Sequence, residues 1–157
     1  MNRTDLNAFR DKMNLSDIQI ASPQKGDELV VGKKQILRAL YNFATSGGAI
    51  GAINLLGDDG KPAVIPDNAI ITKVLVDVIT APTSGGAATI ALGANTTTDI
   101  KAATAIASYT GIVACVPVET AASCVKTTAD RNVVATVATA ALTAGRFYVL
   151  VEYIVTE

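Results

Sequence analysis

Apolar side chains alternate with other residues in two long stretches of the chain, 69–80 and 146–156, and this period of two is typical of a β-strand. In the C-terminal stretch, one face carries Phe147, Val149, Val151, Tyr153 and Val155. In the other stretch, one face carries only Thr72, Val74, Val76 and Val78. Both stretches are therefore expected to form long strands with one face in a hydrophobic core.

Shorter stretches of the same character occupy much of the chain from residue 36 onward. Further strands are predicted at residues 36–44, 50–56, 63–65, 87–92, 112–118, 123–127 and 132–138. Polar turns separate most of them, at residues 45–48, 57–60, 66–68, 81–86, 95–99 and 142–145. Residues 100–107 are rich in alanine and are compatible with either a strand or a short helix.

This succession of short strands and polar turns predicts an all-β fold, an antiparallel β-sandwich or jelly roll. We expect fewer than about one residue in six to be helical, against an average near one third. Strands do not alternate with long helices, which argues against a parallel α/β fold. A length of 157 residues favours one domain with a core of its own.

The first 35 residues differ from the rest and are expected to form an N-terminal arm, with the β-sandwich body at residues 36–157. Leu6, Phe9 and Met13 recur at helical spacing, so a short amphipathic helix is predicted at residues 5–13. A helix of this length is marginal alone, so it must pack on its own body, a sister subunit or a larger partner. The candidate interface residues of the arm are Leu6, Phe9, Met13, Ile18, Ile20, Leu29 and Val30.

Charge and composition limit the classes of partner that the protein is expected to bind. The formal net charge is -1 and the basic residues are mostly scattered, so neither nucleic acid nor a membrane surface is expected as a partner. The start of the chain lacks the apolar core of a secretory signal, and the uncharged runs 39–57 and 78–98 contain turn residues. We expect a soluble protein folded in a reducing cytoplasm. The stretch 132–145 carries little charge, which favours either contact with a further copy or a strand buried on both sides.

Catalytic and metal-binding patterns are scarce. The sequence has no histidine, which removes the commonest general base and the commonest metal ligand. Asp58-Asp59-Gly60 is predicted to be a turn, since the further carboxylates of a calcium loop are missing. Asp77 and Glu152 lie on predicted strands and could meet as a carboxylate pair, but each is equally compatible with a solvent-facing position. The sequence therefore predicts neither an enzyme nor a cofactor or metal site.

The two cysteines, Cys115 and Cys124, lie in opposite arms of a predicted hairpin formed by residues 112–118 and 123–127. If the turn is centred on Glu119-Thr120, the two thiols face each other and a disulfide is compatible with an oxidising setting. The alternative, which we favour for a cytoplasmic protein, is two reduced, inert residues.

Three segments resemble a recurrent pattern in small structural proteins of tailed bacteriophages. The first is Ile65-Pro66-Asp67-Asn68-Ala69-Ile70-Ile71, at the entry to a long strand. The second is Ala88-Thr89-Ile90-Ala91-Leu92-Gly93. The third is the ending Leu142-Thr143-Ala144-Gly145, followed by Val151-Glu152-Tyr153. The resemblance spans residues 36–157 and leaves the arm uncovered.

This resemblance implies a virion protein, assembled in the host cytoplasm. The first expectation is a capsid decoration (cement) protein, commonly a homotrimer, which clamps neighbouring copies of the major capsid protein. A tail, neck or head-fibre component is the alternative within the virion. A carbohydrate-binding β-sandwich module is the alternative from another class, and it would show a row of exposed aromatic side chains.

Overall fold

The computed structural model describes residues 34–116 and 124–156, of which 59% lie in strands and 6% in helices. For these residues, both the all-β prediction and the low helix content are confirmed. The strands form two larger antiparallel sheets and one two-stranded sheet. The predicted arm at residues 1–35 falls almost wholly outside the described residues, so the division at residue 35 stays a prediction.

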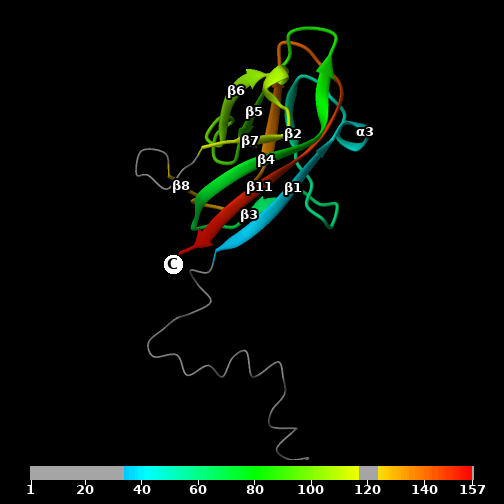
Figure 1. The fold of residues 1–157 in the computed structure, drawn as a ribbon. Coiled ribbons are helices and arrows are strands. Elements are labelled where there is room, and N and C mark those ends of the chain that lie inside the picture. The colour runs from blue at the N-terminus through cyan, green and yellow to red at the C-terminus, as the bar shows by residue number, and fades with distance from the viewer. Residues whose placement is uncertain (1–33, 117–123, 157) are drawn as a thin grey trace, which may run out of the picture. The chain divides into compact units, whose positions relative to one another are not determined.

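The first sheet, sheet A, lies at the front of Figure 1. Its middle strands are β11 (Leu142–Val155) and β4 (Ala69–Ser84). On one side, β1 (Gln35–Asn42) pairs with β11. On the other side, β7 (Ile112–Ala114) and β8 (Val125–Lys126) pair with different parts of β4. The long strands predicted from alternation therefore form the centre of this sheet.

The remaining strands are shorter. Sheet B has the order β2 (Gly51–Asn54), β10 (Val134–Ala138), β5 (Thr89–Gly93) and β6 (Lys101–Ala105). The two-stranded sheet pairs β3 (Val64–Ile65) with β9 (Arg131–Asn132). Two short helical turns complete the described chain, α3 (Phe43–Ser46) and η1 (Ile106–Ser108). The first follows β1 directly, so the strand predicted at residues 36–44 ends two residues early.

The core lies between the inner faces of the two larger sheets. Sheet A contributes Val76 from β4 and Phe147, Val149 and Val151 from β11, all fully buried or nearly so. The ring of Phe147 stacks on Tyr41 at 4.8 Å between ring centroids. From sheet B, the core includes Ile90, Leu92, Ala135 and Val137. The inner face of residues 146–156 predicted from alternation is thus confirmed, and each large side chain contributes roughly 1.5–3 kcal/mol by burial.

Two predicted turns are wrong, because β4 and β11 continue through them. Leu142 pairs with Ser84, so residues 81–84 and 142–145 belong to strands and not to turns. The pairing there is irregular, and Gly145 has a φ of 139°, a value that side-chain-bearing residues rarely adopt. A Cβ at Gly145 would lie 2.9 Å from the Cα of Pro82. The turn residues thus allow a bulge within a continuous ladder.

The predicted cysteine hairpin is also wrong. Its two arms contain β7 and β8, and within the described residues each pairs with β4 and neither with the other. The buried Thr127 hydroxyl fixes the second arm, since it donates to the Pro66 carbonyl at 2.6 Å and accepts from the Ala69 N–H at 2.8 Å. Both thiols are free, with Cys115 half-buried and Cys124 exposed. The long edge of β4 therefore takes the hydrogen bonds that a hairpin would have used.

Candidate interaction surface

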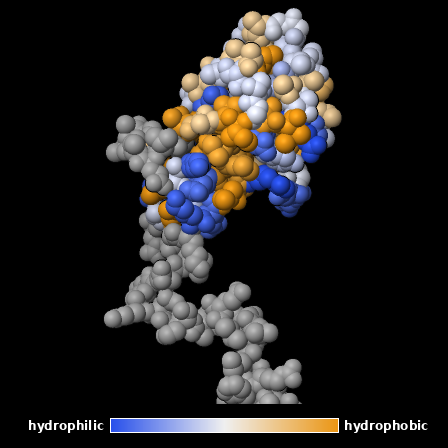
Figure 2. Space-filling model, viewed as in Figure 1, coloured by the Kyte–Doolittle hydropathy of each residue, from blue (hydrophilic) through white to orange (hydrophobic). Residues whose placement is uncertain are grey.

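The outer face of sheet A, which points away from sheet B, carries an unusual share of apolar side chains. Ile36 of β1, Ile79 of β4 and Ile112 of β7 are 71%, 55% and 66% exposed. The cross-strand neighbours Leu75 and Leu150 lie half-buried among them. Figure 2 shows a hydrophobic patch in the middle of the face turned to the viewer. An exposed apolar patch with a polar rim is typical of an interaction surface.

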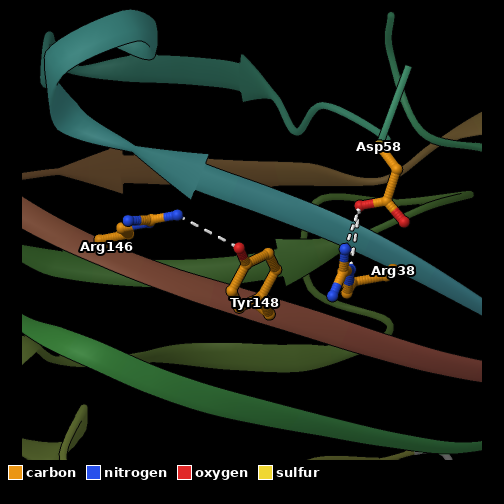
Figure 3. Close-up of polar contacts among 4 residues, drawn as sticks. All are labelled: Arg38, Asp58, Arg146 and Tyr148. Atoms are coloured by element: carbon orange, nitrogen blue, oxygen red, sulfur yellow. Dashed lines mark hydrogen bonds and ion pairs between the residues drawn. The ribbon is translucent and has the colours of Figure 1, made fainter. Parts of the chain in front are cut away.

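Charged groups border this patch on the β1 side. The Arg38 guanidinium bonds the Asp58 carboxylate at 2.7 and 2.9 Å, and this contact raises the pKa of Arg38. Arg38 also lies 4.9 Å from the centre of the Tyr148 ring, and Arg146 donates to the Tyr148 hydroxyl at 3.3 Å (Figure 3). Tyr148 is thus held between two cations, which fixes its ring on the outer face.

A second polar group borders the patch near the C-terminal end of β11. The Glu152 carboxylate accepts from the Thr72 hydroxyl at 2.7 Å and pairs with the Lys34 ammonium at 3.0 Å. These two interactions, the Thr72 hydrogen bond first, lower the pKa of Glu152. Both side chains of the pair remain in contact with solvent, so the pair orients side chains at the rim more than it stabilises the fold.

A groove of about 750 Å³ lies beside β1, and Ile36 connects it with the outer face. One wall is formed by Ile36, Leu37 and Arg38 of β1. The opposite wall comes from the segment before β3, from Val64 and from Asn132. The groove is wide and open, and it holds apolar and charged side chains together.

The candidate carboxylate pair does not form. Asp77 is the cross-strand partner of Tyr148, whereas Glu152 is the partner of Lys73. The two acids therefore lie four positions apart along the sheet, about 13 Å. Asp58 and Asp59 form the predicted turn, in which the Asp59 carboxylate accepts from the Lys61 N–H at 3.0 Å. Across residues 34–116 and 124–156, no group of three or more acids or cysteines is placed to hold a metal ion.

The candidate interface residues of the arm, Leu6 to Val30, lie outside the described residues. What sequence reasoning missed is the outer face of the body. A signal was present, since Leu75 and Ile79 stand among charged residues on the face of β4 opposite the predicted core face. No helix within the described parts of the chain has the length and apolarity needed to cross a membrane.

The comparisons with known proteins bear on the fold. Neither a protein-family model nor a curated protein sequence matches the chain. Three solved structures match with a TM-score of 0.56 each. A chain in the acid-stable capsid of Helicobacter pylori bacteriophage KHP30 is 16% identical, with 81% of this chain and 92% of that chain covered. A chain in the capsid of Ralstonia phage GP4 is 19% identical, with 81% and 87% covered.

The third structure is the capsid asymmetric unit of cyanophage Pam1, in which a chain is 20% identical, with 87% of this chain and 92% of that chain covered. At these identities the likeness shows a shared fold. Each comparison covers at least 81% of this chain and at least 87% of the other chain, so the shared fold is not confined to a short segment of either.

Proposed function

We propose that this chain is a structural protein of a bacteriophage virion, and more narrowly a capsid decoration protein. The observation that carries the proposal is the likeness, over at least 81% of this chain and 87% of the other, to three chains from phage capsids. The pattern of the "IP-x-N-A-I-I" segment and of the "L-T-A-G … V-E-Y" ending supports the same reading. The protein acts by binding, without catalysis or cofactor.

The exposed outer face of sheet A is the proposed contact with the major capsid protein. Its middle is apolar, around Leu75, Leu150 and Ile112, and its rim carries paired charges such as Arg38 with Asp58. This arrangement matches protein interfaces, in which an apolar centre is surrounded by polar groups. The rim charges give orientation, and burial of the apolar centre gives affinity.

The arm is the proposed second contact. In this proposal its apolar residues, Leu6, Phe9 and Met13 above all, insert into a neighbouring subunit and so clamp the shell. Burial of those three side chains would contribute on the order of 5 kcal/mol before ordering costs. The homotrimer belongs to the same proposal, and the molar mass of the purified protein, measured by light scattering, tests it.

The alternatives differ in what they require. A tail, neck or head-fibre component would use the same fold at a lower copy number. A carbohydrate-binding module would need a row of exposed aromatic rings, whereas Tyr41, Tyr109 and Tyr153 are all buried. In the described parts of the chain, Tyr148 is the one tyrosine that lies on the surface, held between its two arginines.

The test of the proposed function is the molar ratio of this protein to the major capsid protein in purified virions, read from stained gels or by mass spectrometry. A decoration protein is expected at a ratio comparable to that of the capsid protein. A trace band would place the protein in the neck, tail or fibre, and its absence from virions would overturn the virion proposal itself.

A further inference from the structure

A small pocket lies on the outer face of sheet A, in the part that β1, β11 and β4 share. Its volume is about 170 Å³, and it is lined by Ile36, Leu75, Leu150, Lys73 and Glu152. Leu75 and Leu150 are directly opposed across β4 and β11. Glu152 pairs with Ile36 on one side and with Lys73 on the other, so these three residues form the next row of the same face. The pocket therefore lies between two adjacent rows of side chains.

The size of the pocket limits what it can hold. Sites for drug-sized ligands usually enclose about 300–1,000 Å³. A cavity of about 150 Å³ lined by apolar side chains, in contrast, accommodates a benzene molecule. The pocket beside Leu75 is of this second kind, since its volume is about 170 Å³. Its size therefore suits one aliphatic or aromatic side chain better than a whole small-molecule ligand.

The apolar lining of the pocket is only partly covered within the described chain. Ile36 is 71% exposed, and Leu75 and Leu150 are half-buried. A side chain seated in the pocket would remove parts of all three from water. Burial of apolar surface is the main favourable contribution to most protein association, so the pocket is suited to hold a partner's apolar side chain.

One charged wall of the pocket is held in place through a bulge in β4. The register of β4 against β11 shifts between Glu152 and Tyr153, so Thr72 has no direct partner on β11. The Thr72 hydroxyl donates to the Glu152 carboxylate at 2.7 Å, and the Lys34 ammonium lies 3.0 Å from the same carboxylate. The Glu152 side chain is therefore fixed by groups other than Lys73.

Lys73 is a cation at the edge of the pocket that has no ion-pair partner among the described residues. Its side chain is exposed, and its cross-strand neighbour Glu152 forms its ion pair with Lys34 instead. The pocket thus places an apolar floor beside a positive charge that a partner's acidic group can pair with.

We propose that this pocket anchors the contact with the major capsid protein. It receives one aliphatic or aromatic side chain of that protein, and Lys73 pairs with a carboxylate close to this side chain in the partner. The inference rests on the proposed function and identifies the site and the chemistry of the contact. Charge complementarity favours an acidic partner residue, because the unpaired charge beside the pocket is positive. A few well-packed anchors in desolvated pockets carry most of the affinity in protein interfaces.

An anchor pocket differs from a flat apolar patch in its response to added bulk. A flat patch tolerates a larger apolar side chain, because that side chain adds apolar surface. A pocket that receives a partner's side chain is blocked by the same change, because two side chains cannot occupy one space. Enlarging a lining residue therefore separates the pocket from the general hydrophobicity of the face.

Leu75→Trp in the full-length protein fills the pocket from its floor. We expect it to bind purified capsids that lack the protein at least about 30-fold more weakly than the wild type, measured by cosedimentation. Ile79→Trp is the matched control, since Ile79 is 55% exposed on the same face and does not line the pocket, and it should bind almost as tightly as the wild type. Ile36→Trp fills the pocket from an exposed wall and should repeat the loss without disturbing the core.

A charge variant tests the acidic partner residue. Lys73→Glu should weaken binding at least about tenfold, because it repels the carboxylate that Lys73 attracts. Lys61→Glu, at an exposed lysine that belongs to no strand of sheet A, is the matched control and should bind like the wild type. Equal effects of the two variants would contradict the acidic partner residue.

Carbodiimide coupling in purified particles identifies the partner. It should join the Lys73 amine through an amide bond to an acidic residue of the major capsid protein, found by mass spectrometry of the cross-linked peptides. Lys73→Met, which keeps the apolar stem of the side chain, should lack this product. Coupling of Lys73 only to acids of its own chain, or of a second copy, would mean that another segment covers the pocket and would overturn the proposal.

The outcomes are distinct from those of the virion ratio that tests the proposed function. If the wild type binds capsids and both pocket-filling variants bind equally well, the pocket is not the anchor, while the proposed function stands. Equal losses for Leu75→Trp and Ile79→Trp would also contradict the pocket. Absence of the protein from virions would remove both the proposed function and this inference.

Discussion

The two faces of sheet A are made by the same strands but differ in the burial and the chemistry of their side chains. The inner face of β11 presents Phe147, Val149 and Val151, each fully buried. The outer face presents Tyr148, Leu150 and Glu152, all partly exposed. The inner face is uniform in chemistry, whereas the outer face mixes aliphatic side chains with ion pairs.

This contrast separates stability from recognition. A face that only excludes water needs apolar bulk, and any charge on it would be costly to bury. A face that also meets a partner needs an apolar centre for affinity and polar groups for orientation. The outer face of sheet A has the mixed composition of the second kind of face, and the inner face has the uniform composition of the first. Substitutions on the two faces should therefore have different effects.

Phe147→Ala should give the largest loss of stability. The ring stacks on Tyr41 at 4.8 Å and contacts Tyr109 at 5.6 Å between centroids, so its removal leaves a cavity in the core. We expect a loss of about 3–5 kcal/mol in the free energy of unfolding, measured by urea denaturation. Tyr148→Ala, one residue away on the outer face, should cost less than about 1 kcal/mol. Equal losses would mean that the two faces are not distinct.

Leu75→Ser combined with Leu150→Ser should separate binding from folding. These two half-buried residues are opposed across β4 and β11 in the middle of the outer face. We expect a loss of less than about 2 kcal/mol in stability but a loss of sedimentation with capsids that lack the protein. Ile50→Ser, at an isoleucine 60% exposed outside sheet A, is the matched control and should still sediment. Retained binding by the double variant would contradict the proposal that the outer face of sheet A contacts the capsid.

Thiol labelling should distinguish the half-buried Cys115 from the exposed Cys124. Cys115 packs against the core at the end of β7, and burial raises the pKa of its thiol to about 11. At pH 8 it should contain roughly 100-fold less thiolate than an ordinary cysteine. In a time course followed by mass spectrometry, we expect Cys124, which is exposed, to react first. In urea, where the protein is unfolded, the two cysteines should be labelled at similar rates. Similar rates in the native protein would mean that the Cys115 thiol is accessible at the surface.

The smallest effect should come from Glu152 at the rim. Its pKa is lowered in the folded protein by the Thr72 hydroxyl and by Lys34, so the stability that it adds is present above its ordinary pKa of 4.5. That stability is lost as the pH falls through the lowered value. Glu152→Gln should therefore lose less stability than the wild type when the pH falls from 5 toward 2, measured by thermal unfolding. Identical pH profiles would show that the ion pair contributes nothing to folding.

The sequence by itself determined the local character of the strands. Alternation over residues 146–156 assigned Phe147, Val149 and Val151 to one face, because successive side chains on a strand must point to opposite sides. The same rule placed Val74 and Val76 in the core, and both are buried. The all-β class followed from many such stretches, and the absence of histidine limited the chemistry before any contact was known.

Only the tertiary structure decided which strands pair and where they end. Gln35 pairs with Tyr153, a partner more than 100 positions away, and no local pattern specifies that choice. Residues 142–145 resemble a turn, yet the facing Ser84 and Thr83 supply a ladder that keeps them extended. The arms of the predicted cysteine hairpin pair with β4, because its long edge accepts both. Pairing depends on which edges and faces remain open once the core has formed, and that is a property of the whole fold.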